Sequence, residues 1–182
     1  VSAAVDLDGK GEGRIDTSVP FLDHMLNLFA RHGLIDLTIR SQGDTEIDDH
    51  HLVEDVGICL GQAVRKALGD RKGISRYGAA VVPMDESLCN VAMDLSGRPY
   101  LIWHAEFGGG RIGEFDPALL REFFKSFSDH GGITLHINLI YGTNLHHMAE
   151  AIFKAFARAF RGAVAMDERV EGVLSTKGSL EG

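Results

Sequence analysis

The sequence contains one passage twice, and this repetition limits the possible folds more than any other feature. Residues 24–33 match residues 122–131, and each copy ends in His-Gly. Each copy continues with alternating apolar residues and then with a His-His-x-x-Glu motif, at 50–54 and 146–150. The pattern predicts a tandem duplication within a single domain, residues 1–182, with repeats at about 1–75 and 76–182. The alternating positions are Ile35, Leu37 and Ile39 in the first copy and Ile133, Leu135 and Ile137 in the second.

Hydrophobic periodicity predicts strands and helices that pack into an α+β fold, each repeat having a sheet and helices. The predicted helices span 20–31, 49–68, 117–128 and 145–161. The predicted strands span 1–7, 34–40, 77–84, 89–95, 100–107 and 133–141. Residues 41–48 are expected to form a polar turn, and the tail from 163 to be irregular.

Composition excludes several classes of partner. With 26 acidic and 18 basic residues the chain carries a charge of −8, spread along its length. This argues against nucleic-acid and membrane partners, which require a basic surface. Cys59 and Cys89 lie in apolar runs without C-x-x-C spacing, as buried thiols of a reducing compartment do. No apolar run approaches the roughly 20 residues of a membrane span, so we expect a cytoplasmic protein.

The two His-His-x-x-Glu motifs predict metal binding. Residues i and i+4 share one face of a helix, so the first His and the Glu of each motif can bind one ion. The second His diverges by about 100° and points to an adjoining face. One such motif is weak evidence, but its recurrence at equivalent places in a duplication indicates metal sites. The pairs are His50 with Glu54 and His146 with Glu150, and the second histidines are His51 and His147.

If two such helices meet, from the two repeats or across a subunit boundary, each can give its pair to one ion and its second His to the other. The repeat alignment offers a fourth ligand for each ion, His24 and its duplicate Glu122. Imidazole and carboxylate without thiolate favour Mn, Fe, Co or Zn over Mg or Ca, and open positions favour catalysis. One site would hold His50, Glu54 and His147, and the other His146, Glu150 and His51.

The remaining histidines have more ordinary interpretations. His32 and His130 precede glycines at helix ends, where a His can interact with the last carbonyl groups. We favour this role for His130 and keep His32 open as a substrate contact. His104 and His136 have ordinary strand positions, and Asp48 and Asp49 are expected to be helix N-caps.

Several motifs, in order along essentially the whole chain, resemble the imidazoleglycerol-phosphate dehydratase family of histidine biosynthesis. They are PFLDHML at 20–26, DDHHLVED at 48–55, PMDE at 83–86, DLSGRP at 94–99, NLHHMAEA at 144–151 and STKG at 175–178. The resemblance implies a duplicated fold like ribosomal protein S5 domain 2, with four-stranded sheets and paired helices. It implies a carbon–oxygen lyase that dehydrates D-erythro-imidazoleglycerol phosphate to imidazole acetol phosphate. It also implies a homo-oligomer, a hollow 24-subunit shell assembled from trimers by metal, with two Mn²⁺ per site between subunits.

The family pattern implies a role for individual residues. Its metal scheme is the reciprocal one derived above, and its phosphate contacts fall on the basic and hydroxyl residues of two later motifs. One ion is held by His50, Glu54, His147 and Glu122, and the other by His24, His51, His146 and Glu150. Phosphate is held by Arg76, Arg98, Ser175, Thr176 and Lys177. Apart from the family pattern, our candidates for catalytic contacts are Glu54, Glu150 and His32, and the acid expected before Val1 is a further candidate for proton transfer.

Two departures from the family pattern stand out. Position 122, commonly His in the family, is Glu here, which can still bind metal but can shift metal preference. The family also has an acidic residue near the substrate, at the N-terminal strand. We expect that residue to precede Val1.

The substrate suggests why metals are needed. The proton to be lost lies beside an alcohol and is not acidic, and hydroxide is a poor leaving group. Two cations on the imidazole ring favour imidazolate, whose electrons can expel the adjacent hydroxyl and give a diazafulvene-like intermediate. The neighbouring C–H then becomes acidic, and its loss gives an enol that tautomerises to the ketone.

Two rival functions use the same ligands. A dinuclear metallohydrolase would make a bridging hydroxide, but the Asp-rich ligand sets expected there are missing from the sequence. A structural or storage shell would use metal only to join subunits. Such a shell would have no use for the Arg and Ser-Thr-Lys phosphate residues.

Overall fold

The predicted helices and strands form, and one strand was missed. The computed structural model describes residues 1–43 and 48–180. The helices are α1 (Pro20–Gly33), α2 (His50–Leu68), α3 (Leu119–Gly131) and α4 (Leu145–Val164). The strands are β1 (Ser2–Asp6), β2 (Gly13–Asp16), β3 (Asp36–Arg40), β4 (Tyr77–Met84), β5 (Ser87–Asp94), β6 (Tyr100–His104) and β7 (Thr134–Tyr141). No described helix is long and apolar enough to cross a membrane.

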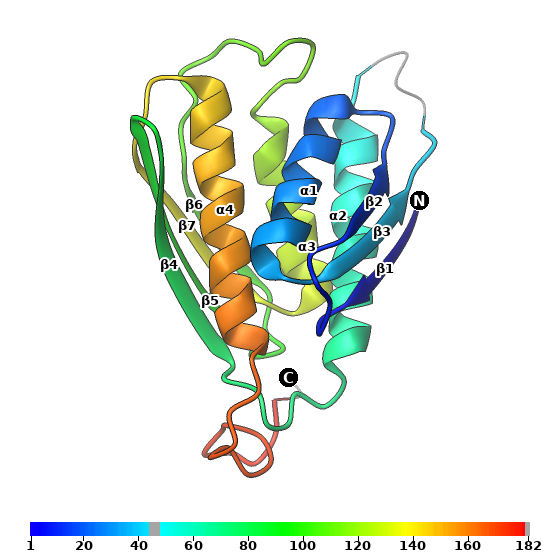
Figure 1. Ribbon diagram of the computed structural model, residues 1–182, viewed down its shortest axis with the longest axis vertical. Coiled ribbons are helices and arrows are strands. Elements are labelled where there is room, and N and C mark those ends of the chain that lie inside the picture. The colour runs from blue at the N-terminus through cyan, green and yellow to red at the C-terminus, as the bar shows by residue number, and fades with distance from the viewer. Residues whose placement is uncertain (44–47, 181–182) are drawn as a thin grey trace.

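The four helices lie between two sheets, and each sheet belongs to one repeat (Figure 1). The first has the order β1-β3-β2 and the second β4-β5-β7-β6. In both, the strand that follows the first helix of the repeat is central, with one antiparallel and one parallel neighbour. The duplicated α+β fold is therefore visible in the strand pairing itself.

The sheets differ by one strand, which corrects the expectation of four strands in each. Strand β4 has no counterpart among the described residues, so the first sheet has three strands there. The missed strand β2 contains one apolar residue, Ile15, and is held by parallel pairing with β3. Residue 34 also does not begin a strand, because Leu34 adopts a left-handed conformation that ends α1.

Aromatic side chains fill the centre of the helical layer. Phe156 of α4 contacts rings from both α1 and α3, with centroid distances of 4.8 Å to Phe29 and 5.3 Å to Phe127. All three side chains are fully buried. Helix α4 packs against α1, and α2 against α3, so the core joins two helix pairs that the duplication makes equivalent.

Candidate metal centre

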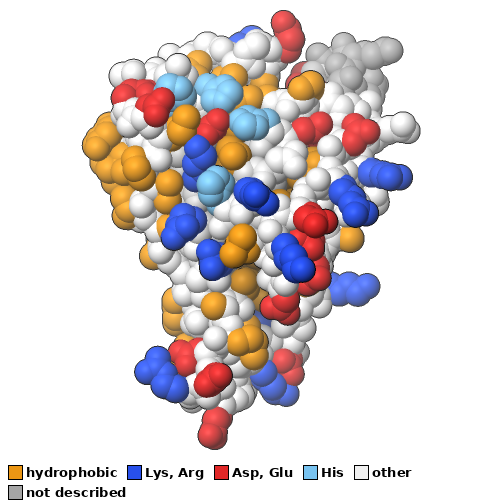
Figure 2. All heavy atoms as spheres, in the orientation of Figure 1, with side chains coloured by type: hydrophobic (Ala, Val, Ile, Leu, Met, Phe, Trp, Pro, Cys, Tyr) orange, Lys and Arg blue, Asp and Glu red, His pale blue; other side chains and the backbone are white. Residues whose placement is uncertain are grey.

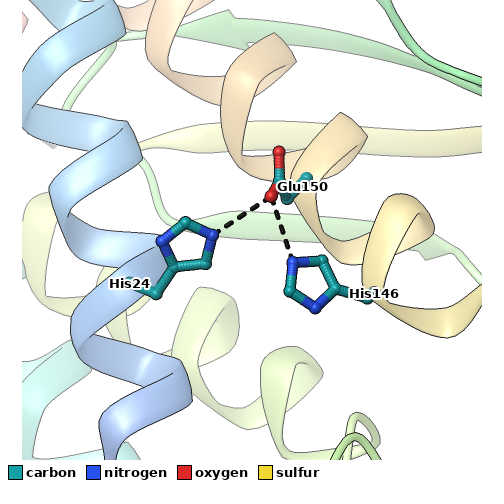
Figure 3. A group of neighbouring side chains, drawn as sticks. All are labelled: His24, His146 and Glu150. Atoms are coloured by element: carbon teal, nitrogen blue, oxygen red, sulfur yellow. Dashed lines mark hydrogen bonds and ion pairs between the residues drawn. The ribbon is translucent and has the colours of Figure 1, made fainter.

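Helices α1 and α4 bring three potential metal ligands together. His24 comes from α1, and His146 and Glu150 lie one turn apart on α4. The Nε2 atoms of His24 and His146 each lie 3.1 Å from Oε1 of Glu150 (Figure 3). One ligand atom from each residue lies within 4.8 Å of the other two. Among residues 1–43 and 48–180, no other three His, Cys, Asp or Glu side chains meet this closely.

The carboxylate of this triad is held as an anion. Burial of Glu150 would raise its pKa, but hydrogen bonds from Lys154, His24 and His146 outweigh burial and lower it to about 2. The Nζ atom of Lys154 lies 2.5 Å from Oε2 of Glu150, one helical turn further along α4. An ionised carboxylate beside two imidazole nitrogens is a donor set that transition metals bind.

Basic side chains follow the triad along the same helix pair. Burial, together with the nearby Lys154 and Arg158, lowers the pKa of His32 at the end of α1. Figure 2 shows His side chains gathered over the upper parts of α1 and α4, with Lys and Arg beside them. His32 therefore has a neutral ring in cationic surroundings.

The predicted ligands of the first repeat are not gathered in the same way. The rings of His50 and His51 lie 6.0 Å apart at the start of α2, and Glu54 follows one turn later. Glu122 of α3 pairs with Arg121, at 3.0 Å between Oε1 and Nη1. Helices α2 and α3 pack together as α1 and α4 do, but these side chains form no group of three ligands within the described residues.

His147 contacts a different carboxylate from the one that its neighbour His146 contacts. Its Nδ1 atom lies 2.7 Å from Oε2 of Glu86, in the turn between β4 and β5. The hydrogen bond to Glu86 raises the pKa of His147, and the hydrogen bond from His147 lowers that of Glu86. The two histidines of this motif are thus directed to separate acids, His146 to Glu150 and His147 to Glu86.

The capping expectations hold in part. Asp48 accepts a hydrogen bond from the backbone N–H of His50 at 3.0 Å, whereas Asp49 makes no side-chain cap hydrogen bond. His130 contacts the carbonyl oxygen of Ser126 at 2.9 Å, which is the predicted interaction with a helix end. His104 and His136 lie in β6 and β7.

The residues expected to bind phosphate line one open cavity of about 1050 Å³, beside the C-terminal tail. The guanidinium of Arg76 binds both carboxylate oxygens of Asp94 and donates to the carbonyl oxygen of Leu174. The backbone N–H of Arg76 donates to Ala163, near the end of α4. This cavity and the triad therefore lie at opposite ends of α4 (Figure 1). The predicted phosphate ligands in the cavity are Arg76, Arg98, Ser175, Thr176 and Lys177.

A sequence model of imidazoleglycerol-phosphate dehydratase matches residues 17–160, which include the triad and both His-His-x-x-Glu motifs. The chain belongs to the imidazoleglycerol-phosphate dehydratase family. The imidazoleglycerol-phosphate dehydratase of Syntrophus aciditrophicus is 64% identical over 181 residues, 99% of this chain and 92% of that protein. That of Citrifermentans bemidjiense is 59% identical over 180 residues, with the same coverage.

Solved structures of the family have the same fold. The dehydratase of Staphylococcus aureus superposes with a TM-score of 0.84 at 43% identity, covering 91% of this chain and 94% of that one. That of Pyrococcus furiosus, crystallised with (S)-C348, gives 0.79 at 36% identity, covering 97% and 94%. This chain is thus a hydro-lyase of the dehydration step in histidine biosynthesis, and the metallohydrolase and storage-shell alternatives lose their support.

Sequence reasoning missed two side chains near the dehydratase's predicted ligands. Lys154 follows Glu150 by four residues, so helical spacing alone could have indicated the contact. Glu86 lies 61 residues before His147, and nothing in the sequence around it indicated that they meet. The four ligands of each ion, as the family pattern has them, do not come together within one described chain.

Proposed function

We propose that the dehydratase binds two divalent transition-metal ions, Mn²⁺ in the first place, and that each ion takes three ligands from one subunit and one from another. The triad of α1 and α4 supports this scheme best. Two imidazole nitrogens and one carboxylate oxygen are a donor set that transition metals bind. Both nitrogens lie 3.1 Å from Oε1 of Glu150, so these three donors are gathered within one subunit. The first ion would use His24, His146, Glu150 and another subunit's His51, and the second His50, Glu54, Glu122 and another subunit's His147.

Sharing between subunits is also favoured by the distance along α4. His146 begins that helix and Ala163, which binds the backbone of Arg76, ends it. At 1.5 Å per residue these points are about 25 Å apart, too far for one small substrate to reach both. We propose that the triad of one subunit and the phosphate cavity of another form the site, in a homo-oligomer of 24 subunits.

The chain's own groups would divide the reaction between them. The bound ions would favour the imidazolate form of the substrate ring, whose electrons help the adjacent hydroxyl to leave. Arg98 and Lys177 would hold the phosphate, with Ser175, Thr176 and Arg76 around it. His32, with its neutral ring beside Lys154, would contact the substrate near the triad. Glu150 and Glu54 are candidates for proton transfer, although both would act mainly as metal ligands.

Activity of metal-stripped protein tests this function. We expect conversion of imidazoleglycerol phosphate, followed by product absorbance, to be lost after chelation and restored by Mn²⁺. The His50→Ala, His146→Ala double variant should lower activity more than about 100-fold, because direct ligands matter more than the groups that orient them. His104→Ala is the control, since His104 lies exposed in β6 and contacts Asn138. Full activity in the metal-free protein would refute metal dependence.

Mixed assemblies test the sharing of ligands. A His50→Ala chain keeps the α4 ligands, and a His146→Ala chain keeps the α2 ligands. Co-expression should restore about a quarter of the activity, because random pairing across an interface produces intact sites at that frequency. No restoration, with both chains present in one purified oligomer, would place all ligands in a single subunit.

A further inference from the structure

Glu86 is fixed in place from several directions, although it lies in a turn between two strands. Its Oε1 atom accepts hydrogen bonds from the backbone N–H of Thr143 at 3.2 Å and of Asn144 at 2.8 Å. The hydroxyl group of Ser87 donates to the same oxygen at 3.1 Å. Its other oxygen, Oε2, lies 2.7 Å from Nδ1 of His147. One carboxylate therefore joins the β4–β5 turn, the loop before α4 and the second His of the motif.

We propose that Glu86 is a positioning residue for metal binding, which holds His147 so that its Nε2 atom faces the ion. This inference rests on the proposed function, in which His147 is the ligand given to another subunit. An acceptor at Nδ1 keeps the proton there and leaves the lone pair on Nε2. Among the described residues, Asp85 is the acid that forms an ion-pair contact with Nε2, and its Oδ2 lies 3.7 Å away, beyond hydrogen-bond distance.

The nitrogen involved distinguishes this contact from those of the triad. His24 and His146 direct Nε2, the expected ligand atom, at Glu150, so binding an ion must alter those contacts. His147 uses the opposite nitrogen for Glu86, so this hydrogen bond can persist when Nε2 binds metal. The backbone hydrogen bonds to Oε1 also fix Glu86 before any ion arrives.

The first repeat has no matching arrangement in the described residues. His51 is the duplicate of His147, and no described carboxylate forms a hydrogen bond or ion pair with its ring. Within the described chain, only His147 of the two second histidines has a carboxylate that holds its ring.

The Glu86→Gln variant tests the proposal by reversing one hydrogen bond. If the amide oxygen keeps the two backbone N–H groups, the amide nitrogen faces His147 and donates to Nδ1. The proton then moves to Nε2, which can no longer bind metal in the neutral ring. We expect one of the two Mn²⁺ ions per chain to bind about 10- to 100-fold more weakly, the usual effect of losing such a partner. Titration of the oligomer against a chelating indicator measures both ions.

Two controls separate positioning from folding. Thr143→Val removes the 3.4 Å contact between the Thr143 hydroxyl and Glu86 but keeps the carboxylate, so both ions should bind normally. In a His147→Ala background, Glu86→Gln should cause no further loss of affinity, because Glu86 then has no ring to orient. A purely structural role would add its effect to that of His147→Ala.

The possible outcomes distinguish the role of Glu86 from the proposed metal-ligand scheme on which it rests. Weakening of one ion by Glu86→Gln that disappears in the His147→Ala background supports positioning. Normal affinity in Glu86→Gln, with weak binding in His147→Ala, overturns the role of Glu86 and leaves the ligand scheme standing. Normal affinity in His147→Ala removes His147 from the ligands and overturns both.

Discussion

The helix pairs α1–α4 and α2–α3 are duplicates, but their side chains pack differently. In α1–α4, the ligands His24, His146 and Glu150 already lie within 4.8 Å of one another. In α2–α3, two glycines of α2 allow close approach: a Cβ at Gly57 would come within 2.6 Å of the backbone oxygen of Phe123, and one at Gly61 within 2.7 Å of that of Phe127. The ligands of that pair remain apart.

The duplication has kept the potential ligands at equivalent places in the two helix pairs, but only α1–α4 holds three of them close together. Both motifs begin a long helix, yet only α4 has a carboxylate fixed by a lysine and two histidines. In α2 the equivalent Glu54 has no ion pair with a described residue. An ion that enters an apo oligomer should therefore find the triad assembled and the second site incomplete, so the two ions should bind in sequence.

The largest effect on stability should come from the ring that the two pairs share. Phe156→Ala removes contacts with Phe29, Phe124 and Phe127 at once and leaves a cavity in the centre of the helical layer. We expect a loss of about 3–5 kcal/mol in the free energy of unfolding, measured with urea on metal-free protein. Tyr100→Ala, at a residue 61% exposed, should change it by less than about 0.5 kcal/mol. If Phe156→Ala and Tyr100→Ala changed the free energy of unfolding equally, the two helix pairs would not share one core.

A smaller effect should appear with acid, and of the two helix pairs we expect it in α1–α4. The pKa of Glu150 is lowered to about 2 in the folded protein, so its stabilisation is complete above the unfolded value of 4.5 and is lost as pH falls from 4.5 towards 2. The shift corresponds to roughly 3 kcal/mol at most. Urea unfolding of metal-free protein at pH values between 6 and 3 measures this loss of stability. In that range the free energy of unfolding of Glu150→Gln should depend less on pH than that of the parent protein.

Glu54→Gln is the matched control, because it changes the duplicate carboxylate in α2. Since Glu54 makes no ion pair with a described residue, this variant removes no ion pair from the folded protein. If Glu54→Gln flattened the curve as much as Glu150→Gln, the two half-sites would be equally assembled in solution. The contrast between the helix pairs would then be wrong.

The sequence predicted the elements better than the contacts between them. All four helices followed from apolar periodicity, because packing against a core imposes it on each helix separately. Strand β2 could not be found in this way, since it depends on pairing with β3 and has one apolar residue, Ile15. The repeat indicated the ligands, and the family resemblance placed His24 with His146 and Glu150, because a separation of 126 residues between His24 and Glu150 gives no local signal. The contact of Glu86 with His147 has no repeat to indicate it.

The smallest effect should separate the starts of α2 and α4. The side-chain oxygen of Asn144 accepts from the backbone N–H of His146 at 2.9 Å and of His147 at 3.3 Å, whereas Asp49 makes no such bond. Asn144→Ala should therefore cost about 1 kcal/mol of stability, and Asp49→Ala no more than the few tenths owed to its charge near a helix N-terminus. Urea unfolding at neutral pH measures both. Because the Asn144 cap holds the turn that carries two predicted ligands, Asn144→Ala should also weaken Mn²⁺ binding, while Asp49→Ala should not. Equal losses in both variants would mean that the first turn of α4 is no better fixed than that of α2.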